Sequence, residues 1–143
     1  MEIVPATTGD LADLRGLVRS CGLRDEDMGL PGQRFLVARE EGRPVGCIGL
    51  EVHGAAGLLR SFAVEPGSRG RGVGRALHGR ALALARELGL RDLFILTTTV
   101  REMALAWGFE EVGRDVVPEA IRQGEQFRSL CPATASCLRL RVP

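Results

Sequence analysis

The chain has 143 residues, the length of one domain, and can bury roughly two-thirds of the surface that it exposes when unfolded. Charged residues make up 26% and hydrophobic residues 45%, and the formal net charge is +1. With no basic arm, no apolar run near the roughly 20 residues of a membrane span and no signal pattern, nucleic-acid and membrane partners are not expected. We expect one cytoplasmic domain over residues 1–143.

The first half of the sequence predicts four strands and one helix. Residues 7–10 offer N-cap side chains for a helix whose apolar face carries Leu11, Leu14, Leu17 and Val18 and which ends at Cys21-Gly22. The polar segment 24–33 is either a loop or a frayed second helix. Apolar strand segments separated by turn residues are expected at 2–6, 34–39, 44–53 and 57–64.

The second half alternates helices and strands. Helices are expected at 74–88, 100–107 and 118–130, the last opened by a proline, and strands at 91–97, 108–113 and 136–142. This order predicts an α/β fold with a mixed, mostly antiparallel sheet flanked by helices.

A glycine-rich segment separates the strand 57–64 from the long helix 74–88. Alternate glycines let the backbone curl so that its N–H groups point inward at the positive end of the helix, which favours an anion and above all a phosphate. No G-x-G-x-x-G fingerprint and no Gly-Lys-Ser/Thr triplet is present, so neither a dinucleotide fold nor a Walker A loop is predicted. The segment consists of Arg69, Gly70, Arg71, Gly72, Val73, Gly74 and Arg75.

The spacing R-x-x-G-x-G after a strand resembles the acetyl-CoA pyrophosphate loop of the GCN5-related N-acetyltransferase (GNAT) superfamily. The alternative is a helix N-terminus in a glycine-rich linker with solvated arginines. The resemblance covers nearly the whole chain and implies the acyl-CoA N-acyltransferase fold, with acetyl-CoA as the donor and its pyrophosphate over 69–75. It further implies that backbone groups of the strand end contact the pantetheine and the thioester, namely those of Phe62, Ala63 and Val64.

The segment Trp107-Gly108-Phe109 is similar to the Gly-Phe pair that ends a family helix, but two expected residues are missing. Family members commonly carry a tyrosine acid four residues before that glycine; here the position is Ala104, and the chain has no tyrosine. Thr97 takes the place of a frequent asparagine. A tyrosine-acid mechanism is therefore excluded, and residues Thr97 to Thr99 either line the pantetheine or replace the acid through a bound water.

A closer resemblance is to arsenic-resistance N-acetyltransferases, which are related to N-acetylglutamate synthase-like acetyltransferases. It rests on the segments 59–64, 96–99, 117–122 and 127–133. The resemblance implies a subfamily and suggests a link to arsenic resistance, but it does not identify a substrate.

Acetyl transfer needs a base, since most amines are protonated at neutral pH. Glu51 and His53 lie two residues apart at the end of a strand and face the same side, so we expect Glu51 to act through water, or His53 directly. Alternatively they form a solvated strand end. Glu102 is a weaker candidate, and Arg60 either clamps an acceptor carboxylate with its planar fork or is a surface charge.

The four cysteines suggest no metal site. Cys21 and Cys47 are expected to be small buried hydrophobic residues. The spacing of Cys131 and Cys137 matches no standard zinc motif; they are either a pair for a thiophilic metalloid or two unlinked thiols.

Three functions remain open. The first is acetyl-CoA-dependent transfer of acetyl to a primary amine of a small, amino-acid-like molecule. The second is a catalytically silent acyl-CoA-binding regulatory module, and the third is protein or peptide N-acetylation. A homodimer is left open, and the sequence does not name the acceptor.

Overall fold

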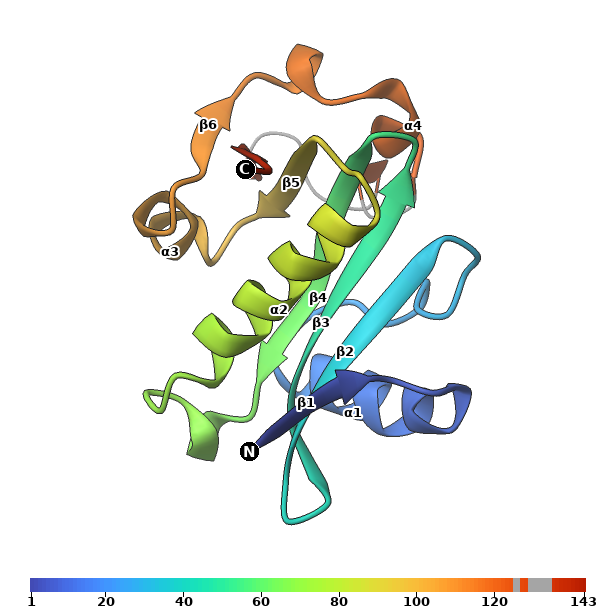
Figure 1. Cartoon of the computed structure of the whole chain (residues 1–143), viewed down its shortest axis with the longest axis vertical. Coiled ribbons are helices and arrows are strands. Elements are labelled where there is room, and N and C mark those ends of the chain that lie inside the picture. Colours follow the sequence, from blue (N-terminus) through green and yellow to red (C-terminus); the bar gives the residue numbers. More distant parts are fainter. Residues whose placement is uncertain (125–126, 129–134) are drawn as a thin grey trace.

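The computed structural model describes residues 1–124, 127–128 and 135–143 (Figure 1). In this part of the chain seven strands form one sheet in the order β1-β2-β3-β4-β5-β7-β6. The strands are β1 (Glu2–Pro5), β2 (Gln33–Glu40), β3 (Arg43–His53), β4 (Ala56–Val64), β5 (Asp92–Thr97), β6 (Glu110–Val112) and β7 (Ser136–Arg141). The helices are α1 (Leu11–Ser20), α2 (Val73–Glu87), α3 (Arg101–Ala106) and α4 (Glu119–Arg122).

The two longer helices cover opposite faces of the sheet, because side chains alternate along each strand. Leu36 and Ile48 point to one face and pack in the core cluster that includes Leu77 of α2. Val37 and Cys47 are the direct neighbours of Leu36 and Ile48 in the chain, and they pack in a second cluster with Leu14 and Val18 of α1. The predicted mixed, mostly antiparallel sheet flanked by helices is confirmed, with β4 and β5 as its parallel pair.

The parallel pair β4–β5 opens part-way along its length. Its register runs only from Ala56 opposite Asp92 to Leu59 opposite Ile95, although both strands continue beyond it. Just past this point Ser61 has a positive φ of 50°, and the pairing of β4 with β3 shifts register between Cys47 and Gly49. Such a bulge bends its strand. The edge of β4 beyond Leu59 is therefore free of β5.

Two expectations about local structure need correction or completion. The helix predicted over 118–130 is wrong in its length, because α4 ends at Arg122 and a turn and a bend follow at Gln123 and Gly124. Phe127 and Arg128 are helical again, and residues 125–126 and 129–130 lie outside the described residues. The segment 24–33 forms turns and the start of β2 rather than a second helix. Within the described ranges, no helix is both long and apolar enough to span a membrane.

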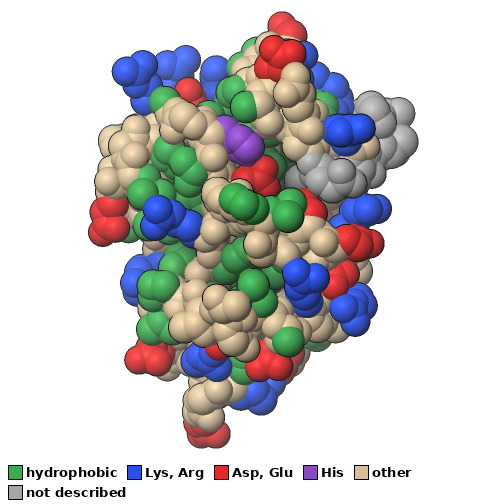
Figure 2. Space-filling model, turned by 90° about the vertical axis from the view of Figure 1, so that its right-hand side faces the viewer, with side chains coloured by type: hydrophobic (Ala, Val, Ile, Leu, Met, Phe, Trp, Pro, Cys, Tyr) green, Lys and Arg blue, Asp and Glu red, His purple; other side chains and the backbone are tan. Residues whose placement is uncertain are grey.

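On the face that Figure 2 shows, charged side chains are spread out instead of gathering in one patch. On the face in Figure 2, arginines alternate with acidic groups and with small apolar areas. On this face no basic stripe is visible of the kind that polyanion binding requires.

Candidate active site

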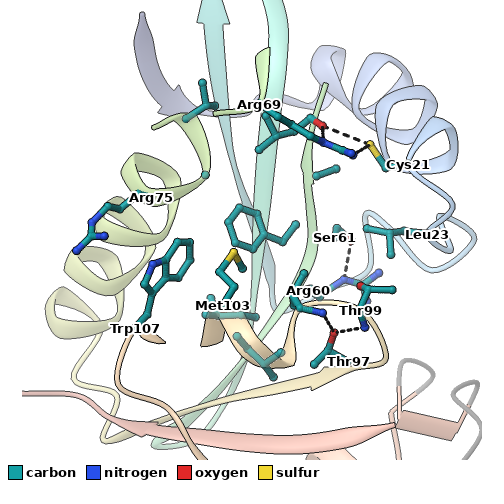
Figure 3. Close-up of a pocket in the computed structure, with 18 of the residues that line it drawn as sticks. Cys21, Leu23, Arg60, Ser61, Arg69, Arg75, Thr97, Thr99, Met103 and Trp107 are labelled. Carbon is teal, nitrogen blue, oxygen red and sulfur yellow. Dashed lines mark hydrogen bonds between the residues drawn. The ribbon is translucent and has the colours of Figure 1, made fainter. Parts of the chain in front are cut away.

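A cavity of about 720 Å³ lies where β4 and β5 separate. Its wall combines the end of α1, the strand β4, the glycine-rich loop with the start of α2, the end of β5 and the helix α3 (Figure 3). Of the residues predicted to bind the cofactor, those that line it are Phe62, Ala63, Val64, Arg69, Gly70, Gly72, Val73, Gly74, Arg75 and Thr97.

The glycine-rich loop presents an open helix N-terminus to this cavity. Gly70 and Gly72 have φ angles of 79° and 82°, a region that glycine enters without steric cost. Gly72 is the N-cap of α2, and no side chain caps the helix there. The first N–H groups of a helix have no partner within the helix, so this end of α2 is suited to bind an anion.

The two arginines that flank Gly70 have different surroundings. Arg69 lines the cavity, donates from Nε to the carbonyl oxygen of Val64 at 3.0 Å, and approaches Cys21 Sγ with Nη2 at 3.6 Å. Arg71 turns away and forms an ion pair with Glu40, at 2.8 Å. Arg71 is therefore the one residue of the predicted loop that does not line the cavity.

The backbone of β4 offers hydrogen-bonding groups on the cavity side. In an antiparallel pair, successive residues direct their N–H and C=O groups to alternate edges. The N–H of Glu65 donates to Val45 of β3, so Val64 turns its own N–H and C=O away from β3. The carbonyl of Val64 accordingly accepts from Arg69. An extended ligand can therefore pair with this edge of β4 as an added strand would.

The end of the cavity far from the glycine-rich loop is polar. Four polar residues lie together there, next to Leu23: Arg60, Ser61, Thr97 and Thr99 (Figure 3). Thr97 is buried, and its Oγ1 accepts from the N–H groups of Thr99 at 3.0 Å and Val100 at 2.9 Å. These bonds cap the turn that leads into α3, so Thr97 has a structural partner besides the cavity.

Arg60 is buried, so the alternative prediction that it is a surface charge is wrong. Its Nη1 and Nη2 each donate to a carboxylate oxygen of Asp27 at 2.6 Å. Nη1 also donates to Glu51 at 3.1 Å, and Nε donates to the hydroxyl of Ser61 at 3.2 Å. Burial alone would lower the pKa of Arg60, but Asp27 and Glu51 outweigh it and raise that pKa, while the bond from Arg60 lowers the pKa of Asp27.

The two candidate bases lie beside this arginine. Glu51 Oε1 and His53 Nε2 are 2.7 Å apart, which confirms that the two side chains face the same side of β3. Glu51 is 8% exposed, so the reading of a solvated strand end does not hold for it. Neither residue lines the cavity; Arg60 does, and it contacts Glu51. The third candidate, Glu102, is exposed and pairs with Arg101.

Aromatic side chains form the side of the cavity next to α2. Phe62 and Trp107 line the cavity with ring centroids 6.1 Å apart, and His78 of α2 lies behind, 4.7 Å from the Trp107 ring. Among the described residues, Nε2 of His78 finds no hydrogen-bond partner. Burial lowers the pKa of His78, and Arg75 lowers it further.

Because the folded protein favours neutral His78, the unfolded chain binds more protons as pH falls below about 6.5, the ordinary histidine value. Stability should therefore decrease from pH 7 to pH 5, and His78→Phe, which keeps an aromatic ring without a titrating group, should weaken that decrease. Thermal unfolding of both proteins at the two pH values measures the effect. Equal pH slopes would show that His78 does not contribute.

The cysteines give a mixed result. Cys47 is buried as expected, and burial raises its pKa to about 12. Cys21 was expected to be buried as well but lines the cavity and is only partly covered. Cys137 is a buried free thiol, whereas Cys131 lies outside the described residues, so their pairing is not tested. No group of three or more metal-binding side chains occurs in the parts of the chain that the structure describes.

Sequence reasoning missed several lining residues because they come from elements without a motif. Ser68, Gly22, Leu23 and Met103 belong to turns and to a short helix, and only the fold brings them to β4. Asp27 was read only as part of a polar loop, since no local pattern indicated its partner Arg60.

Comparison with known proteins agrees with this geometry. The profile of the Acetyltransferase (GNAT) family matches residues 10–109, well over half of the chain. The chain belongs to this family. The match includes α1 and the two segments that carry the resemblance, the glycine-rich loop and Trp107-Gly108-Phe109.

Relatives of this GNAT protein include acetyltransferases for different substrates. It is 33% identical over 107 residues to an IAA acetyltransferase of Azospirillum brasilense (73% of this chain, 63% of the relative). It is 38% identical over 84 residues to an amino-acid acetyltransferase of Mycobacterium tuberculosis (56% and 48%). The fold matches N-acetylglutamate synthase from Neisseria gonorrhoeae complexed with coenzyme A and N-acetyl-glutamate, with TM-score 0.84 and 24% identity (100% and 36%). The chain thus spans about a third to two thirds of these proteins.

Proposed function

We propose that this GNAT protein transfers acetyl from acetyl-CoA to a primary amine of a small, amino-acid-like molecule. The observation that carries the proposal is one continuous cavity that joins the open N-terminus of α2 to the free edge of β4. The first suits a pyrophosphate and the second an extended pantetheine arm. The amino-acid-like acceptor is favoured by the amino-acid acetyltransferase and N-acetylglutamate synthase among the similar proteins.

The residues support direct attack of a neutral amine on the thioester carbon. Backbone N–H groups of the segment Phe62–Val64 polarise the carbonyl and stabilise the oxyanion of the tetrahedral intermediate. When that intermediate collapses, the C–S bond breaks and the CoA thiolate leaves, taking a proton from water since no tyrosine is available. Glu51 accepts the proton of the attacking amine through a water, with His53 hydrogen-bonded to it as the alternative base.

One observation favours a second candidate, a silent acyl-CoA-binding module. Both proposed bases lie outside the cavity lining, and Glu51 is engaged by Arg60. A binding module needs the glycine-rich loop and the β4 edge but no base, so the two candidates predict the same CoA binding and differ only in turnover.

An acceptor panel separates the candidates. The protein is incubated with acetyl-CoA and with free amino acids, their amides, simple amines or peptides, and the release of CoA thiol is followed. We expect turnover with amino acids above the background without acceptor. Turnover with peptides alone would indicate protein N-acetylation, and CoA binding without any turnover would indicate the silent module. The chain contains no lysine, so N-acetylation of the protein itself is limited to its N-terminal amine.

The link to arsenic resistance is part of the proposal because the similarity to arsenic-resistance N-acetyltransferases suggests it. It predicts that an arsenic-sensitive bacterium grows at higher arsenic concentrations when it expresses this chain than when it expresses a variant unable to bind acetyl-CoA. Equal growth of the two strains would remove this link without affecting acetyl transfer.

A proline at position 64 tests the role of the β4 edge. Val64→Pro removes the N–H that faces the cavity, so loss of one ligand hydrogen bond should raise the acetyl-CoA Kd roughly tenfold. Val64→Ala keeps the N–H and is the matched control. Calorimetry measures both Kd values; an unchanged Kd in the proline variant would show that this edge does not bind the cofactor.

A further inference from the structure

The segment that follows α1 is held in place by two buried side chains rather than by regular structure. Gly22, Gly29 and Gly32 have φ angles of 78°, 93° and 85°, and no helix or strand covers residues 22–32. Yet Met28 is 2% exposed and Asp27 9%. Met28 packs in the cluster under α1. Burial in an apolar environment does not favour the carboxylate of Asp27, and this group is buried because it pairs with Arg60.

Arg60 and Asp27 form a bidentate ion pair, in which two N–H groups donate to the two carboxylate oxygens. This is the strongest geometry for this pair of groups. Both carboxylate oxygens accept at 2.6 Å, and the Arg60 side chain is fully buried. With Glu51 and Ser61 included, four hydrogen bonds leave this guanidinium for partners within the protein. The guanidinium of Arg60 therefore already donates to groups of the protein, which argues against its binding the carboxylate of an acceptor.

A second tie joins the same segment to the sheet. Gln33 Oε1 accepts from the N–H groups of Gly29 and Leu30, at 2.8 and 3.2 Å. Its Nε2 donates to the carbonyl of Asp27 at 2.9 Å and to Glu51 at 3.3 Å. Asp27 and Gln33 thus connect the segment to the pair of Arg60 and Glu51 beneath the polar end of the cavity.

We propose that Asp27 is a positioning residue for the acceptor. By holding Arg60 it fixes the segment 22–32 against β4, and with it the part of the cavity wall that Leu23 forms next to Ser61. In Figure 3 Leu23 and Ser61 lie away from Arg69 and Arg75 of the glycine-rich loop, so we expect Asp27 to affect acceptor binding more than cofactor binding. The proposal rests on the proposed acetyltransferase function, because an acceptor must bind there.

The test compares Asp27→Asn with Asp25→Asn. Asparagine keeps the size of Asp27 but turns one acceptor oxygen into an NH₂ group that faces a guanidinium donor. Asp25 lies in the same segment and pairs with exposed Arg19, so its variant controls for a change in the segment as such. With the best acceptor of the panel above, Asp27→Asn should raise the acceptor KM about tenfold or more and leave the acetyl-CoA KM within about twofold.

Two further measurements separate positioning from a general loss of stability. In Asp27→Ala, added formate should restore part of the acceptor affinity by binding to Arg60, whereas chloride should not. Hydrogen exchange should become faster in residues 22–32 of Asp27→Asn, but not in Asp25→Asn. The exchange measurement needs no turnover.

The possible outcomes are distinct. Unchanged acceptor KM and unchanged exchange in Asp27→Asn would overturn the inference. Equal rises in both KM values with no formate rescue would also overturn it, since Asp27 would then have only a general structural role. If the parent protein acetylates nothing in the panel, the proposed function fails, and exchange still decides whether Asp27 holds the segment.

Discussion

Gly72→Val is expected to abolish measurable acetyl-CoA binding, with a Kd at least about 100-fold above that of the parent. Gly72 has a φ of 82°, and a β-branched residue in that region is strained by an estimated 1–3 kcal/mol, so the loop must move. Apart from the chain neighbours of Gly72, no atom of the described residues lies within 4 Å of a Cβ built there, so the effect comes from backbone strain and not from a clash within the protein. Movement of the loop displaces the N-cap of α2, so the first N–H groups of the helix no longer point toward the proposed pyrophosphate site. Calorimetry with acetyl-CoA measures the Kd.

Gly79→Val is the matched control, because it introduces the same side chain into the same helix. A Cβ at Gly79 also meets no atom within 4 Å, and its φ is not positive. Its acetyl-CoA Kd should stay within about threefold of the parent value, since it lies outside the first turn, where the helix dipole acts. Gly74→Val should also weaken binding, since its Cβ would already lie 3.4 Å from the Phe62 ring. Binding by Gly72→Val as tight as in the parent would show that the pyrophosphate site is elsewhere.

The order of strands and helices could be predicted because each element carries its own signal. The continuous apolar runs of β2 and β3 and the helical spacing of Leu14 and Val18 are local properties of the sequence. The length of the helix at 118 could not be predicted in the same way. Proline marks its start, but its end depends on what packs around it: Ile121 is fully buried and the chain turns at Gln123.

The proposed cofactor end of the site was more predictable than the proposed acceptor end for a physical reason. The glycine-rich loop presents its own backbone to the cavity, so seven consecutive residues carry the whole pattern. The surroundings of Arg60 are built from side chains that meet only in the fold: Asp27 and Arg60 are 33 positions apart and bond at 2.6 Å. The sequence identified Arg60 and Glu51 as notable residues but could not show that they neutralise each other, and this pairing changes what each can do.

Glu51→Gln is expected to lower kcat on the order of 100-fold, with the acetyl-CoA Kd unchanged. The substitution removes the carboxylate that we propose takes the proton of the amine. Glutamine has nearly the same shape and keeps one oxygen to accept from Arg60, which also retains both bonds to Asp27. The fold should therefore persist. Rates at saturating acceptor and calorimetry with acetyl-CoA measure the two quantities separately.

Glu111→Gln is a suitable control, because it too removes a strand carboxylate paired with an arginine, but its partner Arg101, unlike Arg60, does not line the cavity. Its kcat should remain that of the parent. His53→Ala distinguishes the two bases: if the imidazole takes the proton, this variant lowers kcat on the order of 100-fold, whereas Glu51→Gln leaves kcat near that of the parent. If Glu51→Gln and His53→Ala both turn over normally at saturating acceptor, neither is the base. The rate would then come from orientation of the small neutral fraction of the amine against the thioester.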